Sequence, residues 1–155
     1  MSTSLASSLG FAKIASTDTI REVLRTQISP TARPALHRSS FEPAGGSATE
    51  DWKETVHALS GGVLAVIERA ISKGTDLLLE GVHYLPNKEV IDLWREAGGV
   101  AIGVVLYVSS EERHRGMIAN REKHNGKKVD HYLGNLDRIR AVSYTHLRAH
   151  ETVSD

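Results

Sequence analysis

Cysteine is absent from the 155 residues of this chain, which excludes disulfide bonds, thiolate catalysis and cysteine-based zinc sites. Aromatic residues make up only 5%, and no apolar run approaches the length of a membrane-spanning helix. The 19 basic residues balance 19 acidic ones, so no net field favours nucleic acid or an anionic membrane as a partner. A hydrophobic content of 40% and the lack of a signal peptide predict one cytoplasmic globular domain, whose oligomeric state the sequence leaves open.

The end of the chain matches a translated sequencing adapter. Val-Ser-Tyr-Thr-His-Leu-Arg-Ala-His-Glu-Thr (142–152) is what results from translating the mosaic end of a widely used transposase-based adapter. We therefore predict a partial domain over residues 1–141 and an artefactual tail over residues 142–155. Excluding the tail also removes His146 and His150, whose i,i+4 spacing would otherwise suggest a metal site.

The best-marked feature is a junction between a strand and a helix at Asp18. The apolar residues 11–15 lead through Ser-Thr-Asp (16–18) into a helical pattern over residues 19–25. Ligands of open α/β sheets bind outside the carboxyl ends of strands, where Asp18 would lie, with Arg21 one turn further on. Taken alone, the stretch favours a simpler role for Asp18, that of an N-cap which accepts backbone N–H bonds.

The rest of the chain alternates amphipathic and apolar segments, which is typical of an α/β fold with buried parallel strands. The chain begins inside a predicted helix, and residues 28–46, with three prolines, predict a loop or a short broken helix. A Gly-Gly pair at 61–62 predicts a close packing contact or a kink. The other expected helices are 51–73 (capped by Ser47 or Thr49), 87–98, one starting at Ser110 and one over 132–140. The other expected strands are one within 76–83, which ends at Glu80, and one over 100–108.

Polar residues collect near the predicted strand ends. Glu80 ends the second strand, where a carboxylate could hold Mg²⁺ or simply bond local amides. The loop over residues 28–46 contains Arg33, His37 and Arg38, which could contact an anionic substrate or be solvated. The segment 113–128 is rich in basic residues and predicts either a solvated helix or a mobile lid that closes over phosphates.

Three stretches resemble 2-phosphoglycerate kinases and their P-loop kinase relatives. They are Ser-Thr-Asp-Thr-Ile-Arg-Glu-Val-Leu-Arg (16–25), Leu-Glu-Gly-Val-His (79–83), and the run from Tyr-Val-Ser-Ser-Glu-Glu-Arg-His (107–114) to Asp-Arg-Ile-Arg (137–140). The resemblance implies a three-layer parallel sheet with helices on both faces. It also implies transfer of a phosphoryl group from ATP, with Mg²⁺, to the hydroxyl of 2-phosphoglycerate, a small phosphorylated acceptor, giving 2,3-bisphosphoglycerate.

The same resemblance implies roles for individual residues. Asp18 would accept or orient the acceptor hydroxyl, and Arg21 would bind the phosphate or carboxylate of the substrate. Substrate contacts would also come from Arg25, Glu80 and His83. The lid candidates that would neutralise charge on the transferred group are Arg113, Arg115 and Arg121, with Arg121 placed among the catalytic residues.

One part of the family pattern is missing. No Gly-x-x-x-x-Gly-Lys-Ser/Thr loop occurs in the sequence, so the phosphate cradle and the metal-binding hydroxyl are absent. Counting back from Asp18 places that loop just before Met1, which predicts an N-terminal truncation. In this fold class the missing first strand would lie between the strands at 77–80 and 104–108, so its loss would expose two apolar edges.

We therefore expect the 155-residue polypeptide to be unstable or prone to aggregation, and not to bind or hydrolyse ATP. Two alternatives to a 2-phosphoglycerate kinase remain at this point. One is a P-loop kinase for another acceptor, such as an inositol phosphate, a sugar or an antibiotic. The other is a non-catalytic regulatory or binding domain of the same fold.

Overall fold

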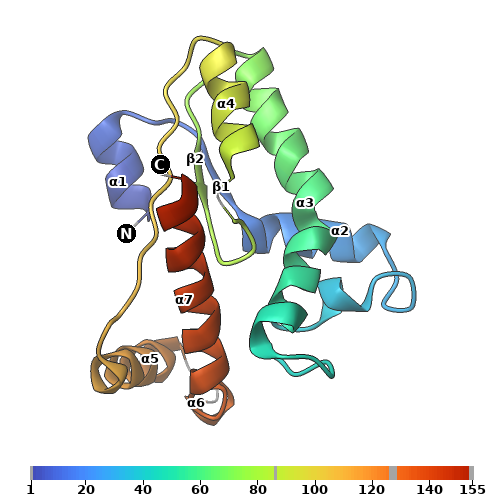
Figure 1. Ribbon diagram of the computed structural model, residues 1–155, viewed down its shortest axis with the longest axis vertical. Helices are drawn as coiled ribbons and strands as arrows, with labels where there is room; N and C mark the ends of the chain where they lie inside the picture. The colour runs from blue at the N-terminus through green and yellow to red at the C-terminus, as the bar shows by residue number, and fades with distance from the viewer. Residues whose placement is uncertain (1, 86, 126–128, 154–155) are drawn as a thin grey trace.

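The computed structural model describes residues 2–85, 87–125 and 129–153. It is a mixed α/β structure in which most of the described residues are helical (Figure 1). In chain order the elements are α1 (Ser2–Leu9), β1 (Ile14–Ser16), α2 (Thr17–Gln27), the 3-10 helix η1 (Pro34–His37), α3 (Ala48–Ser72), β2 (Leu78–Glu80), α4 (Lys88–Glu96), α5 (Glu111–Asn125), α6 (Val129–Leu133) and α7 (Leu136–Val153).

The two strands form a short parallel sheet, as the sequence predicts. Ile14 pairs with Leu78 and Ser16 with Glu80, so the carboxyl ends of both strands lie at one edge. Both strands are shorter than expected, three residues each. This register places the segment after Ser16 beside the segment after Glu80, and these two segments contain Asp18 and His83.

The core lies between α3, η1 and the face of α2 that turns toward α3. Its fully buried members are Leu36, Leu59, Val63 and Ile67. Of the Gly-Gly pair, Gly62 makes the close packing contact, whereas Gly61 faces open space, and α3 is continuous from Ala48 to Ser72. A Cβ atom on Gly62 would lie 2.9 Å from the side chain of Ile20, so α2 and α3 approach closely here.

The start of α3 follows the sequence closely. Ser47 is the N-cap, and its hydroxyl accepts the backbone N–H of Glu50 while the Glu50 carboxylate accepts the N–H of Ser47. This reciprocal capping box satisfies two backbone donors that a helix end otherwise leaves unpaired. The polar cap uses residues that are neighbours in sequence, so it marks the start of the helix without a tertiary contact.

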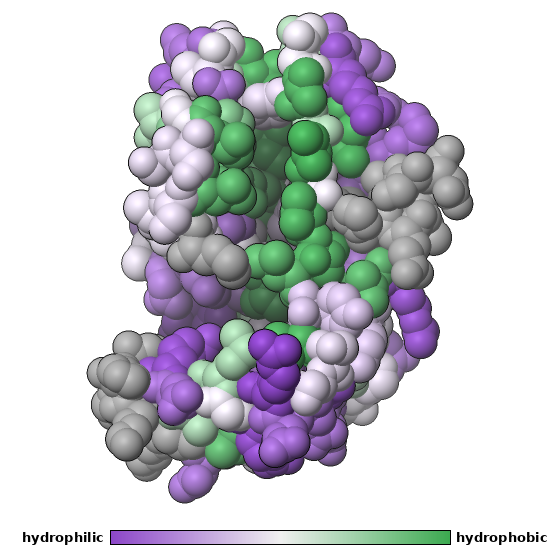
Figure 2. Space-filling view, turned by 90° about the vertical axis from the view of Figure 1, so that its left-hand side faces the viewer, coloured by the Kyte–Doolittle hydropathy of each residue, from purple (hydrophilic) through white to green (hydrophobic). Residues whose placement is uncertain are grey.

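The predicted strand over residues 100–108 is wrong for this structure. The segment is extended, but the sheet of the described residues contains β1 and β2 alone. Its alternate side chains point into solvent, and Val100, Ile102, Val104 and Leu106 are between 67% and 82% exposed. In Figure 1 the segment descends beside α7, and Figure 2 shows the hydrophobic band on that side of the molecule. A strand needs a neighbour for its backbone hydrogen bonds, and neither β1 nor β2 pairs with this segment.

These exposed alternate residues support the expectation that the polypeptide aggregates, because unpaired apolar strands template pairing between chains. Replacing Ile102 with lysine is expected to reduce self-association, since a charge on an exposed apolar segment opposes its pairing with another chain. Light scattering measured against protein concentration checks this. Val23→Lys, at a 60% exposed apolar position on α2, is the matched control. An equal gain in solubility from both variants would contradict a specific role for residues 100–108.

The predicted C-terminal helix is two helices, α6 and α7, and α7 continues through the predicted domain boundary at residue 141. Within α7, Val142 is only 3% exposed and Thr145 lies 3.1 Å from the Thr49 hydroxyl. The assignment of residues 142–155 to an adapter rests on the sequence and stays a prediction. Of the described helices, none has the length and hydrophobicity needed to cross a bilayer.

Candidate functional site

The Asp18 carboxylate stands at the carboxyl edge of the sheet, in the first turn of α2. The N-cap of α2 is Ser16, whose side chain makes no capping bond. The alternative role of Asp18 as the cap is therefore wrong. Its side chain is 69% exposed, and a carboxylate in the first turn is also favoured by the helix dipole. Asp18 is thus free to meet a ligand from solvent.

His83 lies directly behind Asp18. The His83 side chain is 1% exposed, and its Nδ1 atom is 3.5 Å from Asp18 Oδ1 and 3.3 Å from the Thr17 hydroxyl oxygen. Two segments that are 65 residues apart in sequence meet here because β1 and β2 are paired in parallel. The sequence-predicted residues Asp18 and His83 are therefore neighbours in space.

The imidazole of His83 is neutral near pH 7. Burial lowers the pKa of His83 from 6.5 to about 4, against an opposing effect of the Asp18 charge and with smaller lowering effects of Arg21 and His146. Burial dominates because the charged imidazolium loses its hydration. Asp18, although close, is exposed to solvent and compensates only in part.

This lowered pKa predicts a pH-dependent stability. Between pH 6.5 and pH 4 the unfolded chain binds a proton at His83 that the folded chain does not, so the free energy of unfolding falls as the pH is lowered through this window. At pH 5 the loss relative to pH 7.5 is expected to be about 2 kcal/mol from this residue. Urea unfolding at both pH values, for the natural chain and for His83→Gln, measures it.

His57→Gln is the matched control for that experiment, because His57 lies exposed on α3. Its pH dependence should equal that of the natural chain. If His83→Gln retains the full loss of stability between pH 7.5 and pH 5, His83 is not the group responsible.

Thr17 is a site residue that the sequence analysis missed. It is fully buried, and its hydroxyl oxygen accepts the backbone N–H of His83 at 3.4 Å. Gly81 faces it so closely that a Cβ atom there would lie 1.9 Å from the Thr17 hydroxyl, and Gly81 also has φ +132°. Thr17 and Gly81 therefore bind the two strand ends together. The sequence shows the Thr-Asp pair and the Glu-Gly-Val-His stretch, but only the pairing of β1 with β2 shows that the two stretches are in contact.

The other predicted substrate residues are more dispersed. Arg21 donates its Nε hydrogen to the Leu36 carbonyl at 3.0 Å, which holds its guanidinium against η1. Arg25 pairs with Glu22 at 2.8 Å on the surface of α2. Glu80 stands at the end of β2, opposite Ser16. The structure thus brings Asp18 and His83 together, holds Arg21 against η1 and leaves Arg25 in a local ion pair.

The three lid candidates lie on α5, which packs chiefly against α6 (Figure 1). Arg113 is exposed, and Arg115 pairs with Glu111 at 3.3 Å. The Arg121 guanidinium lies 5.2 Å from the centre of the Tyr132 ring. Residues 126–128 of the predicted basic segment lie outside the described residues. A lid role for these arginines stays a prediction.

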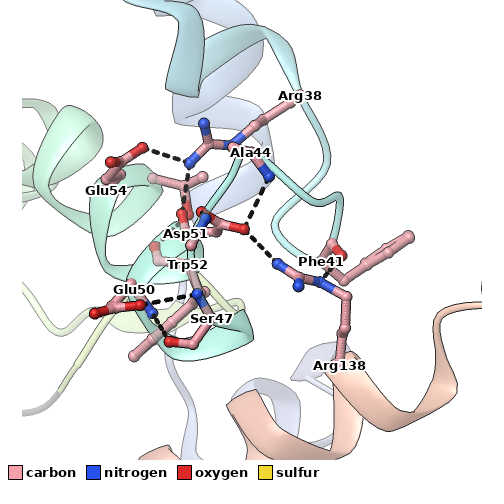
Figure 3. A network of polar contacts seen from close by, with 11 residues as sticks. Arg38, Phe41, Ala44, Ser47, Glu50, Asp51, Trp52, Glu54 and Arg138 are labelled. Carbon is pink, nitrogen blue, oxygen red and sulfur yellow. Dashed lines mark hydrogen bonds and ion pairs between the residues drawn. The ribbon is translucent and has the colours of Figure 1, made fainter.

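A second polar network holds the loop between η1 and α3 (Figure 3). Asp51, 3% exposed, accepts the backbone N–H groups of Ala44 and Gly46 and pairs with Arg138 of α7 at 2.5 Å. The Ala44 N–H above all holds the pKa of Asp51 below its usual value, with Gly46 and Arg138 acting in the same direction against the effect of burial. The Arg138 Nε atom also donates to the Phe41 carbonyl at 2.9 Å.

Two of the three loop residues that could contact an anionic substrate form hydrogen bonds within the protein instead. Arg38 donates to the Asp51 carbonyl and to Glu54, both at 2.7 Å. His37 Nε2 lies 2.8 Å from the Ile28 carbonyl. These groups shape the loop, and Arg33 remains exposed beside it. Within the described part of the chain, no three or more histidines, aspartates and glutamates gather where they could hold a metal ion.

Comparison with known proteins gives one consistent match. The chain is 30% identical to a protein named 2-phosphoglycerate kinase from Pyrococcus horikoshii, over 90% of this chain and 47% of that protein. A relative of the same name from Methanococcus maripaludis is also 30% identical, over 90% and 48%. One from Methanothermobacter thermautotrophicus is 35% identical, over 76% and 41%. No family model and no solved structure matches the chain.

The resemblance to 2-phosphoglycerate kinases is therefore confirmed, and these proteins are homologues of this chain over 76% to 90% of its length. The chain spans about half the length of the curated relatives that it matches.

Proposed function

We propose that this chain, a homologue of about half of a 2-phosphoglycerate kinase, forms the acceptor-binding side of an ATP-dependent small-molecule kinase. Its acceptor would be 2-phosphoglycerate and the product 2,3-bisphosphoglycerate. The observation that carries the proposal is the meeting of Asp18 and His83 at the carboxyl edge of the parallel strands, with Arg21 one turn further along α2, in a chain homologous to proteins of that name.

The chemistry of these three groups suits such an acceptor. The molecule offers a hydroxyl group beside two anionic groups, a phosphate and a carboxylate. The exposed Asp18 carboxylate can accept or orient the hydroxyl proton. Arg21 brings a guanidinium that is already oriented by Leu36 and can bind an anionic oxygen. His83 adds an imidazole that is neutral near pH 7. A neutral ring avoids the desolvation cost of a buried charged group.

ATP and Mg²⁺ would be the other reactants in the complete enzyme. The residues present do not fit ATP, because the sequence has no glycine-rich phosphate loop. Magnesium in such sites is held by one or two carboxylates and by substrate phosphates, a role that Glu80 at the end of β2 fits. The part of the reaction that this chain performs is therefore to bind and orient the acceptor.

The proposal includes the finer predictions made from the family. The complete fold would be a P-loop three-layer sheet with helices on both faces, in which β1 and β2 are two of the parallel strands. The enzyme would work in the cytoplasm on a small phosphorylated molecule. Arg113, Arg115 and Arg121 would belong to a lid over the transferred phosphoryl group.

A phosphoryl-transfer assay tests the proposal. The chain is compared with a fusion in which it replaces the homologous half of the Pyrococcus horikoshii relative, each supplied with ATP, Mg²⁺ and one acceptor. The fusion should phosphorylate 2-phosphoglycerate, and the chain alone should transfer nothing. Inositol phosphates, sugars and aminoglycoside antibiotics serve as competing acceptors. A folded fusion that prefers one of these, or phosphorylates none, would overturn the proposal.

A further inference from the structure

We propose that the open groove between residues 32–46 and residues 50–58 of α3 is an anion-binding site that takes a phosphate group. The groove has a volume of about 1020 Å³, which is the size of a small-molecule site. Its lining residues lie within these two ranges, whereas Asp18 and His83 lie at the ends of β1 and β2. The groove is therefore a site separate from the sheet edge, and the inference does not rest on the proposed function.

The acidic side chains in the walls of the groove already have donors within the protein. Asp51 accepts two backbone N–H groups and pairs with Arg138. Glu54 pairs with Arg38 at 2.7 Å, as Figure 3 shows. Glu50 accepts the backbone N–H of the residue that caps α3. Two of these three carboxylates are thus neutralised by an arginine, and Glu50 is held by the helix cap.

Two cationic side chains in the walls are left over. Arg33 and Lys53 are exposed, and neither side chain makes a hydrogen bond or an ion pair with any residue that the structure describes. Once the pairs of Asp51 and Glu54 are set aside, these two positive charges face the single negative charge of Glu50. The groove therefore has an excess of positive charge, which favours an anion over a cation or a neutral molecule.

The two walls of the groove are held together before any ligand binds. Arg38, from the loop, donates to the Asp51 carbonyl and to Glu54, both on α3 and both at 2.7 Å. The turn at Gly46 packs so closely on α3 that a Cβ atom there would lie 2.9 Å from Asp51 Oδ1. A site whose walls are already fixed loses less conformational entropy when a ligand binds.

A phosphate group suits the two free cations. Arg33 belongs to the loop wall and Lys53 to the α3 wall, so an anion in the groove can be bound from both sides. A guanidinium binds phosphate oxygens through its planar fork, and an ammonium binds them as a point charge. A phosphate monoester carries a charge of about −1.5 to −2 at pH 7, enough to meet both cations, whereas a carboxylate carries a single charge.

Backbone amide ¹H–¹⁵N spectra of the full 155-residue chain at pH 7 locate the site. Inorganic phosphate is added at constant ionic strength, because salt screens the charges of an exposed site. We expect the amide signals of Gly45, Gly46 and Lys53 to shift together with one dissociation constant. The amides of Asp18 and His83 report on the proposed acceptor site in the same spectra.

A second titration, with 2-phosphoglycerate, distinguishes the two sources of a phosphate group. Tighter binding of 2-phosphoglycerate at the groove amides assigns the groove to a phosphorylated metabolite, and equal binding assigns it to free phosphate. Both results support the site. Shifts at Asp18 and His83 without shifts in the groove would overturn the site and leave the proposed function standing.

Arg33→Gln and Lys53→Gln test the two cations. Both side chains are exposed, so the fold should be kept, and each variant should bind phosphate about tenfold more weakly because it loses one charge-assisted hydrogen bond. Arg69→Gln and Lys73→Gln are the matched controls, since both residues are exposed at the opposite end of α3. An equal loss of affinity in the controls, or full affinity in both groove variants, would overturn the proposal.

Discussion

Replacing Trp52 with alanine is expected to lower the free energy of unfolding by about 3 to 5 kcal/mol, the usual cost of deleting a buried tryptophan. Trp52 is fully buried on α3, and its indole N–H donates to the Val82 carbonyl at 2.8 Å. The residue next to Val82 is His83, so Trp52 supports the backbone that places the imidazole. The variant should therefore lose stability and also disturb the His83 ring. Urea unfolding and ¹H–¹⁵N spectra of the histidine rings measure the two effects.

Trp52→Phe separates packing from hydrogen bonding. It keeps most of the apolar volume but leaves the Val82 carbonyl without its donor, for which about 1 to 3 kcal/mol is expected. Trp94→Phe, at a half-buried position on α4, is the matched control and should cost less. A loss below about 1 kcal/mol in Trp52→Ala would mean that Trp52 does not hold this part of the fold.

Replacing Asp18 with asparagine is expected to lower the kcat of the active fusion enzyme by about 10² to 10⁴, the range for loss of a positioned acid or base. Asparagine has nearly the same shape but cannot take a proton. The binding of 2-phosphoglycerate should change little, because Arg21 and His83 remain. Steady-state kinetics with varied acceptor concentration separate kcat from KM.

Glu22→Gln is the matched control, because it removes a carboxylate from the same helix one turn away. The Glu22 side chain is 62% exposed and pairs with Arg25 on the surface of α2. Its kcat should stay close to that of the unmodified fusion. An Asp18→Asn enzyme with unchanged turnover would remove Asp18 from the mechanism and leave it a first-turn carboxylate that stabilises α2.

Several local features could be predicted from sequence because they depend on nearby residues. Ser47 and Glu50 fix the start of α3 through their own backbone, and the apolar stripe of α3 predicts which face is buried. The parallel pairing of β1 with β2 also followed from two apolar segments separated by a helix. Residues 100–108 have an equally strong apolar pattern, yet they pair with neither β1 nor β2. A strand forms only where a neighbouring strand accepts its backbone hydrogen bonds, and the apolar pattern does not specify that neighbour.

The candidate site also has features that the sequence predicts and features that only the tertiary structure shows. The sequence by itself determined which residue types were available: an acid after the first strand, an arginine one turn later, a glutamate at the end of the second strand and a histidine after it. Only the tertiary structure decided that Asp18 and His83 meet, that Thr17 lies between the strand ends, and that Arg38 and Asp51 belong to a loop network. The physical reason is that burial and hydrogen-bond partners come from residues distant in sequence, and burial is what makes the His83 imidazole neutral.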